Sequence, residues 1–317
     1  MNEQTTTFIS GTAGLAGTLT LPDGPGPHRA ALLIAGSGPL DRDGNMKRMP
    51  LGISRDLASM LADNGWASYR FDKRGVAESD GDYLSTGFFQ ELADAEAACR
   101  WLATHPDVDD VVAIGHSAGA LAAAALAGRV PDLAGAVLLA APAKTGDATL
   151  RWQAAQMKDH LLPAPVKALL RLFRTDLVKQ QAKAITRLRA TTGDVARIQL
   201  AKVNAKWMRE FIDYDPKTAL QRVAAPVLAI TGSKDVQVDA VDLAVIAELV
   251  PTASETHVLP DVDHILRPEV EPVSNPRRYG KQLKSPIDER VEALIGEWLA
   301  QLPSRNGAVA DSAAPSG

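Results

Sequence analysis

Two hydrophobic rhythms alternate along this chain, and each predicts a different kind of element. Short, uninterrupted apolar runs such as 30–35 and 111–114 are typical of strands that are buried on both faces of a parallel sheet. Between such runs, apolar residues recur at intervals of three and four, as in helices that bury one face. Strands that take turns with helices in this way predict an α/β protein with a mostly parallel central sheet and helices on both of its faces.

The boundaries of the predicted elements follow from these runs and from the glycine and proline residues between them. Strands are expected at 15–21, 30–35, 66–71, 111–114, 136–140, 226–230 and 254–259, and helices at 51–64, 88–104, 120–125 and 285–302. We expect Ser285 to cap the last helix, with Pro286 in its first turn. The tail 304–317 consists mostly of Ala, Gly and Ser and is expected to be disordered.

The pattern changes between residues 147 and 222, where no convincing strand appears and the helical stretches are broken by prolines and a glycine. This segment holds 15 Lys and Arg against 7 Asp and Glu, so it carries +8 while the rest of the chain carries −12. Such a charge surplus fits either a solvated outer face or a mouth that attracts anions. We therefore expect a core formed by 1–146 and 223–303, with 147–222 inserted into it as a helical cap.

Composition and charge exclude several classes of protein. Of the 317 residues, 46% are apolar and 23% charged, which is enough for a substantial core. The net charge of −4 and the absence of any apolar run near the ~20 residues that span a bilayer argue against a nucleic-acid partner and against stable membrane insertion. Residues 1–7 lack the basic start and the apolar stretch of a signal peptide. Cys99 is the only cysteine, which excludes an internal disulfide, and together these features favour a cytoplasmic protein.

The strongest chemical signal is the pentapeptide Gly115-His116-Ser117-Ala118-Gly119. It follows a predicted strand and precedes a stretch of small residues, which is the context of a nucleophile elbow. The turn is so tight that Cβ atoms on either side of the serine would clash, and Gly115 and Gly119 avoid that clash. Ser117 is therefore the candidate nucleophile. Backbone amides at the start of the following helix would favour a negative charge that develops on the substrate oxygen.

A serine hydroxyl needs a base to remove its proton at neutral pH. Of the six histidines, only His264 lies in a loop after a late predicted strand, so it is the candidate base, whereas His116 is expected to point away from the serine oxygen. Asp235 closely follows the strand 226–230, at the sheet edge where ligands bind in open α/β proteins. It is the candidate acid that would fix the histidine tautomer. Other acids could take this role, namely Asp147, Asp213, Asp215 and Asp263.

The chain order Ser117, Asp235, His264, together with the elbow and the strand pattern, resembles the α/β-hydrolase fold over nearly the whole chain. Three further segments are similar to the oxyanion loop, the D-x-R-G-x-G-x-S segment and the acid loop of bacterial esterases and serine aminopeptidase-like hydrolases: 36–45, 72–79 and 231–235. Ala77 stands where the second of these segments usually has its second glycine. The resemblance implies that 147–222 is a cap inserted after the sixth strand.

The same resemblance implies an oxyanion hole formed by the backbone amides of Ser37 and Ala118. Gly36 and Gly38 would allow the loop after the strand 30–35 to bring an unpaired N–H close to the elbow. The HG dipeptide that is common in this fold is absent, so the amide of a neighbouring loop residue stays an alternative donor.

These residues predict a serine hydrolase that needs no cofactor or metal and acts on small-molecule carboxylic esters. Ser117 would attack the carbonyl carbon, His264 would accept the proton and Asp235 would orient His264. Amide, N-terminal peptide or thioester cleavage by the same residues is a second hypothesis, because the tetrahedral chemistry is shared. An aminopeptidase would need an acid in the cap to hold the substrate ammonium, and Glu210 and Asp213 are candidates. A third hypothesis is a non-catalytic ligand-binding protein on the same fold.

Overall fold

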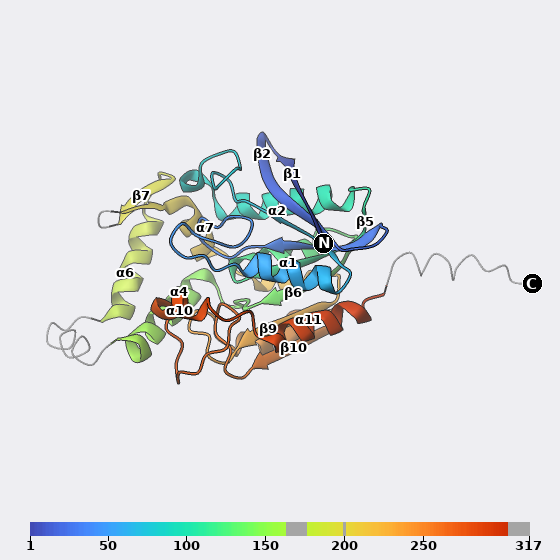
Figure 1. Ribbon diagram of the computed structural model, residues 1–317. Helices are drawn as coiled ribbons and strands as arrows, with labels where there is room; N and C mark the ends of the chain where they lie inside the picture. The colour runs from blue at the N-terminus through green and yellow to red at the C-terminus, as the bar shows by residue number, and fades with distance from the viewer. Residues whose placement is uncertain (163–175, 199–200, 304–317) are drawn as a thin grey trace, which may run out of the picture.

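The computed structural model describes residues 1–162, 176–198 and 201–303 (Figure 1), so the expected disordered tail lies outside the described residues. The central sheet contains the strands β1 (Asn2–Ser10), β2 (Ala13–Leu21), β3 (His28–Ile34), β4 (Ala67–Phe71), β5 (Val108–His116), β6 (Leu133–Leu139), β9 (Val227–Gly232) and β10 (Ser254–Leu259). Their order across the sheet is β1-β2-β4-β3-β5-β6-β9-β10.

The sheet is mostly parallel, as predicted. Strands β4, β3, β5, β6, β9 and β10 all run in one direction, and β2 is antiparallel to both of its neighbours. The expected strands are all present within a few residues of their predicted bounds, which confirms the α/β architecture. β1 was not predicted, because this edge strand is rich in polar residues and buries only Phe8 and Ser10.

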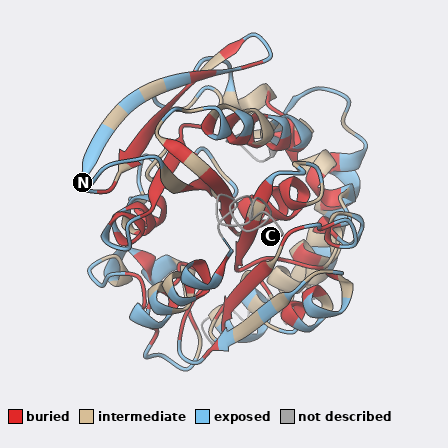
Figure 2. Ribbon diagram, turned by 90° about the vertical axis from the view of Figure 1, so that its right-hand side faces the viewer, coloured by how far each residue is buried: buried red, intermediate tan, exposed pale blue. Residues whose placement is uncertain are grey.

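Helices cover both faces of the sheet. The helices of the described residues are α1 (Ile53–Asp63), α2 (Phe88–Ala103), α3 (Ala118–Ala127), α4 (Gly146–Gln156), α6 (Leu177–Arg189), α7 (Ala205–Asp213), α8 (Lys217–Leu220), α9 (Asp242–Leu249), α10 (Tyr279–Gln282) and α11 (Glu289–Gln301), with the short helical segments η1 (Tyr83–Ser85), η2 (Met157–Leu161) and η3 (Pro276–Arg278). Figure 2 shows the buried strands in the centre, with helices around them that expose their outer sides.

Neighbouring residues of one strand serve two different cores. Leu32, for example, packs in a cluster with α2, α3 and α9, whereas Leu33 packs in a second cluster with α1 and α11. This division follows from the pleat, because successive side chains of a strand point to opposite faces. Both faces are therefore dry, which explains why the central strands read as continuous apolar runs.

The last helix begins later than expected. Asp288 caps α11 by accepting a hydrogen bond from the backbone N–H of Arg290 at 3.0 Å, and the helix starts at Glu289. The prediction of Ser285 as the cap is wrong. Its backbone N–H donates to the carbonyl of Gln282, so Ser285 belongs to the turn that follows α10.

The segment that follows β6 contains α4, α6, α7, α8 and a two-stranded hairpin of β7 (Val195–Ile198) and β8 (Ala201–Asn204). The expectation of a segment without strands is wrong here, because two four-residue strands are too short to leave a periodic pattern. The segment has a small core of its own, formed by Ile185, Leu188, Ala205 and Ile212. This core and the gathering of these helices at one end of the molecule (Figure 1) support the cap 147–222, whose boundaries stay a prediction.

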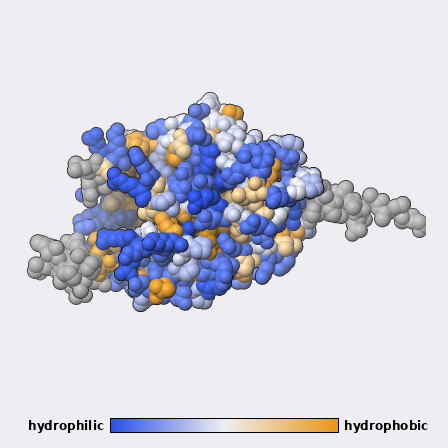
Figure 3. Space-filling model, viewed as in Figure 1, coloured by the Kyte–Doolittle hydropathy of each residue, from blue (hydrophilic) through white to orange (hydrophobic). Residues whose placement is uncertain are grey.

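The face of the molecule that Figure 3 shows is mostly hydrophilic, with apolar residues scattered over it. None of the helices in the described part of the chain is long and apolar enough to cross a membrane.

Candidate functional site

The predicted nucleophile elbow lies at the centre of the sheet. β5 ends at His116, α3 begins at Ala118, and Ser117 between them adopts φ +56° and ψ −119°, which is a strained conformation for a residue with a side chain. A Cβ atom at position 115 would lie 2.1 Å from the carbonyl oxygen of Gly119. The predicted reason for Gly115 is therefore confirmed, because any other residue would collide with the helix.

The loop after β3 lies directly against this elbow. A Cβ at position 119 would be 2.1 Å from the carbonyl oxygen of Ile34, and one at position 36 would be 3.3 Å from Cβ of Ser117. The backbone N–H of Ser37 has no hydrogen-bond partner among the described residues. The N–H of Ala118 is in the first turn of α3, where no intrahelical acceptor is available. Two unpaired donors thus flank the serine, as an oxyanion hole requires.

His264 and Asp235 form a buried hydrogen-bonded pair. Nδ1 of His264 lies 2.8 Å from Oδ2 of Asp235, and their side chains are 6% and 0% exposed. The other carboxylate oxygen of Asp235 accepts from the backbone N–H groups of Gln237 and Val238 at 2.7 and 2.8 Å. The carboxylate therefore holds Nδ1 as the protonated nitrogen and leaves Nε2 free to act as a base.

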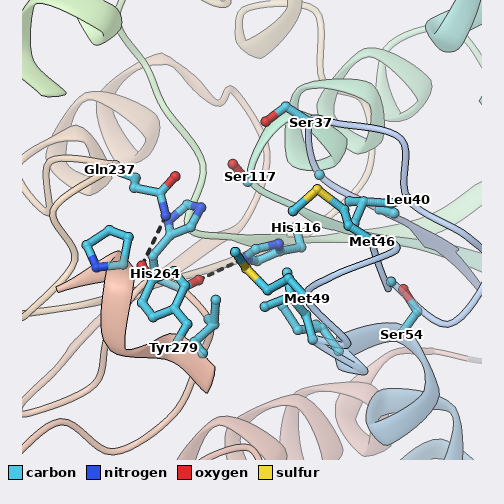
Figure 4. Close-up of a pocket in the computed structure, with 17 residues that line it drawn as sticks. Ser37, Leu40, Met46, Met49, Ser54, His116, Ser117, Gln237, His264 and Tyr279 are labelled. Carbon is cyan, nitrogen blue, oxygen red and sulfur yellow. Dashed lines mark hydrogen bonds between the residues drawn. The ribbon is translucent and has the colours of Figure 1, made fainter. Parts of the chain in front are cut away.

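The two loops that carry this pair are fixed side by side. The N–H of Lys234 donates to the carbonyl of Val262 at 2.9 Å. A Cβ at Gly232 would be 2.1 Å from the same carbonyl oxygen, so only glycine allows this approach. Ser117 and His264 line one pocket (Figure 4), which places the three predicted residues at the same edge of the sheet.

The alternative acids are occupied elsewhere. Asp147 pairs with Arg151 and Arg189, Asp213 pairs with Arg189, and Asp215 accepts from the N–H of Lys217. Asp263 accepts the backbone N–H groups of Ile265 and Arg267 at 3.1 and 3.0 Å. The geometry therefore favours Asp235 as the partner of the histidine.

His116 has a place that the sequence did not predict. Its Nε2 donates to the backbone carbonyl of His264 at 2.7 Å, and the two imidazole rings lie 4.9 Å apart (Figure 4). Burial, reinforced by the nearby His264, lowers the pKa of His116 to about 3, so its ring is neutral. His116 was expected only to point away from the serine oxygen, and this hydrogen bond adds a second role, because the ring holds the loop that carries His264.

Two pockets meet at Ser117. The methionine pocket, of about 220 Å³, is lined by Ser117 and His264 and by apolar residues of the loop before α1, among them Met46, Met49 and Leu51. The α7 pocket, of about 530 Å³, lies between the elbow and the inserted segment, where α7 supplies Trp207, Met208 and Phe211. Ser37, Ser117 and Gln237 line both pockets. A substrate could therefore extend in two directions from the serine.

The histidines, cysteine and acids of the described chain form no cluster of three or more that could hold a metal ion.

Ala77, which replaces a glycine of the D-x-R-G-x-G-x-S segment, adopts φ +47°. This left-handed conformation explains why glycine is usual at that position, because an alanine there carries a steric cost.

Comparisons with known proteins show the family and the fold to which this chain is similar. The family model for serine aminopeptidase, S33, matches residues 51–271. The chain is 28% identical to the esterase EstD of Thermotoga maritima over 290 residues, or 91% of this chain and 66% of EstD, so it spans just under two thirds of that relative. Est1E of Butyrivibrio proteoclasticus, solved with bound ferulic acid, aligns with a TM-score of 0.63 and 16% identity, covering 94% of this chain and 98% of Est1E.

The proline iminopeptidase of Mycobacterium smegmatis aligns equally well, with a TM-score of 0.63, 16% identity and the same two coverages. At 16% identity, the similarity to these two structures shows a shared fold and does not show a shared substrate. The predicted α/β-hydrolase fold is thereby confirmed.

Proposed function

Because the chain belongs to the serine aminopeptidase S33 family of α/β hydrolases, we propose that it is a serine hydrolase that cleaves carboxylic esters. The proposal depends mainly on one observation. His264, which is held by a buried hydrogen bond to Asp235, lines the same pocket as Ser117. Ser117 itself lies on a strained elbow, beside two unpaired N–H groups.

These residues would act in two half-reactions. Ser117 Oγ attacks the carbonyl carbon while its proton moves to Nε2 of His264, and Asp235 stabilises the imidazolium that forms. The N–H groups of Ser37 and Ala118 donate to the oxyanion, and losing one donor of such a hole typically costs about 3 kcal/mol. The alcohol leaves with the proton from Nε2. Water then gives a proton to Nε2 of His264 and attacks the acyl carbon. As the bond to Ser117 breaks, that proton passes from Nε2 to Oγ of Ser117, and the acid is released.

The pocket walls support ester over aminopeptidase chemistry. An aminopeptidase needs a carboxylate for the substrate ammonium, and no Asp or Glu lines either pocket in the described part of the chain. The two candidate acids are engaged elsewhere: Glu210 accepts from the N–H of Phe89 at 2.9 Å, and Asp213 pairs with Arg189. The charged residue that does line the α7 pocket is Lys202, which would repel an ammonium.

The position of His264 indicates which pocket would hold the alcohol half of the substrate and which would hold the acyl half. The leaving alcohol must reach Nε2, and His264 lines the methionine pocket but is not among the described residues that line the α7 pocket. We therefore place the alcohol in the methionine pocket and the acyl group in the larger α7 pocket. Since the volumes are about 220 and 530 Å³, esters of small alcohols with larger acids should be the better substrates.

A covalent probe tests the nucleophile directly. A fluorophosphonate should add to the wild-type protein once, with the label on Ser117 by peptide mass spectrometry. Ser117→Ala should abolish both labelling and the hydrolysis of p-nitrophenyl esters, while the matched control Ser54→Ala, in the wall of the same pocket, should retain them. Label on another residue, or turnover by Ser117→Ala, would contradict the assignment.

Three substrates with the same acyl group test which bond the protein cleaves: an ester, an anilide and a thioester. An ester should be cleaved well and the corresponding anilide poorly, and a thioester serves as the third substrate. Aminoacyl anilides cleaved faster than the esters would favour the aminopeptidase hypothesis. No hydrolysis of any of the three, without labelling, would favour a non-catalytic binding protein.

We also propose that the protein works in the cytoplasm. Its only cysteine, Cys99, is a free and buried thiol, and burial raises the pKa of this thiol to about 12. A chain without disulfides suits a reducing compartment. Fractionation of expressing cells tests this location.

A further inference from the structure

A buried ammonium lies directly beneath the loop that carries Ser37. Lys73 follows β4 by two residues and is 7% exposed. Its Nζ donates to the carbonyl oxygen of Gly36 at 2.6 Å and forms an ion pair with Glu91 of α2 at 3.0 Å. Lysine is among the residues that folded proteins bury least readily, because its charge must leave water. A buried lysine spent on one loop carbonyl therefore invites an explanation.

The carbonyl of Gly36 and the N–H of Ser37 belong to the same peptide group. This group is planar and trans, so its C=O and its N–H point in opposite directions. When Lys73 fixes the oxygen on the inner side of the loop, the hydrogen must point to the other side, where Ser37 lines both pockets beside Ser117. The orientation of the proposed oxyanion donor thus depends on a residue that does not touch the substrate.

The ammonium also strengthens the donor. A hydrogen bond accepted by a carbonyl polarises the peptide group, which makes its N–H a better donor, and the effect is larger away from water. Glu91 holds Lys73 in place, and Oε1 of this glutamate is buried without a hydrogen-bond partner among the described atoms. Among the described residues, the hydrogen bond that this ion pair makes to another part of the site is therefore the one from Lys73 to the carbonyl of Gly36.

We propose that Lys73 is a positioning residue that orients and polarises the Gly36–Ser37 peptide so that the N–H of Ser37 stabilises the oxyanion. This inference rests on the proposed function, because it assigns a supporting residue to the same reaction. Three groups would thus be linked by hydrogen bonds from α2 to the reacting oxygen: Glu91, Lys73 and the Gly36–Ser37 peptide.

The first test is Lys73→Met, which removes the ammonium and keeps an unbranched side chain. We expect kcat to fall about 10- to 100-fold, less than the full loss of an oxyanion donor, with KM changed less than about 2-fold. The affinity for a boronic acid, which forms a tetrahedral adduct with Ser117, should fall by the same factor as kcat. A loss confined to KM, or an unchanged kcat, would overturn the proposal.

A double-mutant cycle separates this role from a merely structural one. Ser37→Pro removes the N–H itself and should lower kcat about 10²- to 10³-fold. Adding Lys73→Met to Ser37→Pro should then cost nothing further, because Lys73 acts only through that N–H. Penalties that multiply in the double variant would show that Lys73 acts by another route and would overturn the proposal.

Controls keep these outcomes interpretable. Lys144→Met removes another ion-paired lysine, whose partners are Asp239 and Asp242, and should leave kcat unchanged. If Lys73→Met does not fold, as judged by circular dichroism, Glu91→Gln serves instead and should lower kcat with KM unchanged; an unchanged kcat there counts against the proposal. A wild-type enzyme that hydrolyses esters while Lys73→Met is fully active refutes this inference alone. A wild-type protein that hydrolyses none refutes the proposed function itself.

Discussion

Asp263 is an acid that the fold buries with an incomplete set of partners. Its residue surface is 0% exposed; Oδ1 accepts two backbone N–H groups, and Oδ2 has no hydrogen-bond partner in the described part of the chain. Burial raises the pKa of this carboxyl from 3.8 to about 6. A difference of about two pH units corresponds to about 3 kcal/mol between the two protonation states.

The sign of the effect follows from proton binding. The native state holds this proton more tightly than the unfolded chain, so the free energy of unfolding falls as the pH rises from about 4 through about 6. Asp263→Asn replaces the carboxylate with a neutral group of the same shape, whose Oδ1 can still accept from Ile265 and Arg267. The variant should match the wild type near pH 4 and exceed its free energy of unfolding by up to about 3 kcal/mol at pH 8.

Urea unfolding at the two pH values, followed by tryptophan fluorescence, measures this difference. The matched control is Asp261→Asn in the same loop, where the side chain is 71% exposed and the change should be small at both pH values. A variant at position 263 that is no more stable than the wild type at pH 8, or that gains the same stability at both pH values, would refute the reasoning.

Three other substitutions probe the site. Asp235→Asn should lower kcat for ester hydrolysis about 10⁴-fold, because an amide no longer fixes the tautomer of His264; a loss below 10-fold would point to another acid. Ser37→Ala should keep kcat within about 3-fold, since the donor is the backbone N–H; a loss as large as that of a missing donor would assign the role to the hydroxyl. Met49→Trp should raise KM for esters of bulky alcohols in a methionine pocket of about 220 Å³ and spare methyl esters; equal effects on both would contradict the assignment of that pocket.

The elements with strong local signals were predictable. The central strands are buried on both faces and therefore carry continuous apolar runs, and the elbow is specified by glycines without which backbone atoms would collide. The hairpin of β7 and β8 gave no such signal, because each strand has only four residues. The cap of α11 was misplaced, since Ser285 and Asp288 are both suitable cap residues and only their surroundings distinguish them.

The amino-acid sequence alone was enough to infer the α/β sheet, the nucleophile elbow and the three candidate catalytic residues. Hydrophobic periodicity and backbone sterics act between near neighbours in the chain, so their signals can be recognised without the fold. The folded chain was needed to learn which charged and polar groups meet. Lys73 reaches the carbonyl of Gly36 across 37 positions, and His116 reaches that of His264 across 148. Such contacts leave no local pattern, since they depend on how distant loops pack at one edge of the sheet.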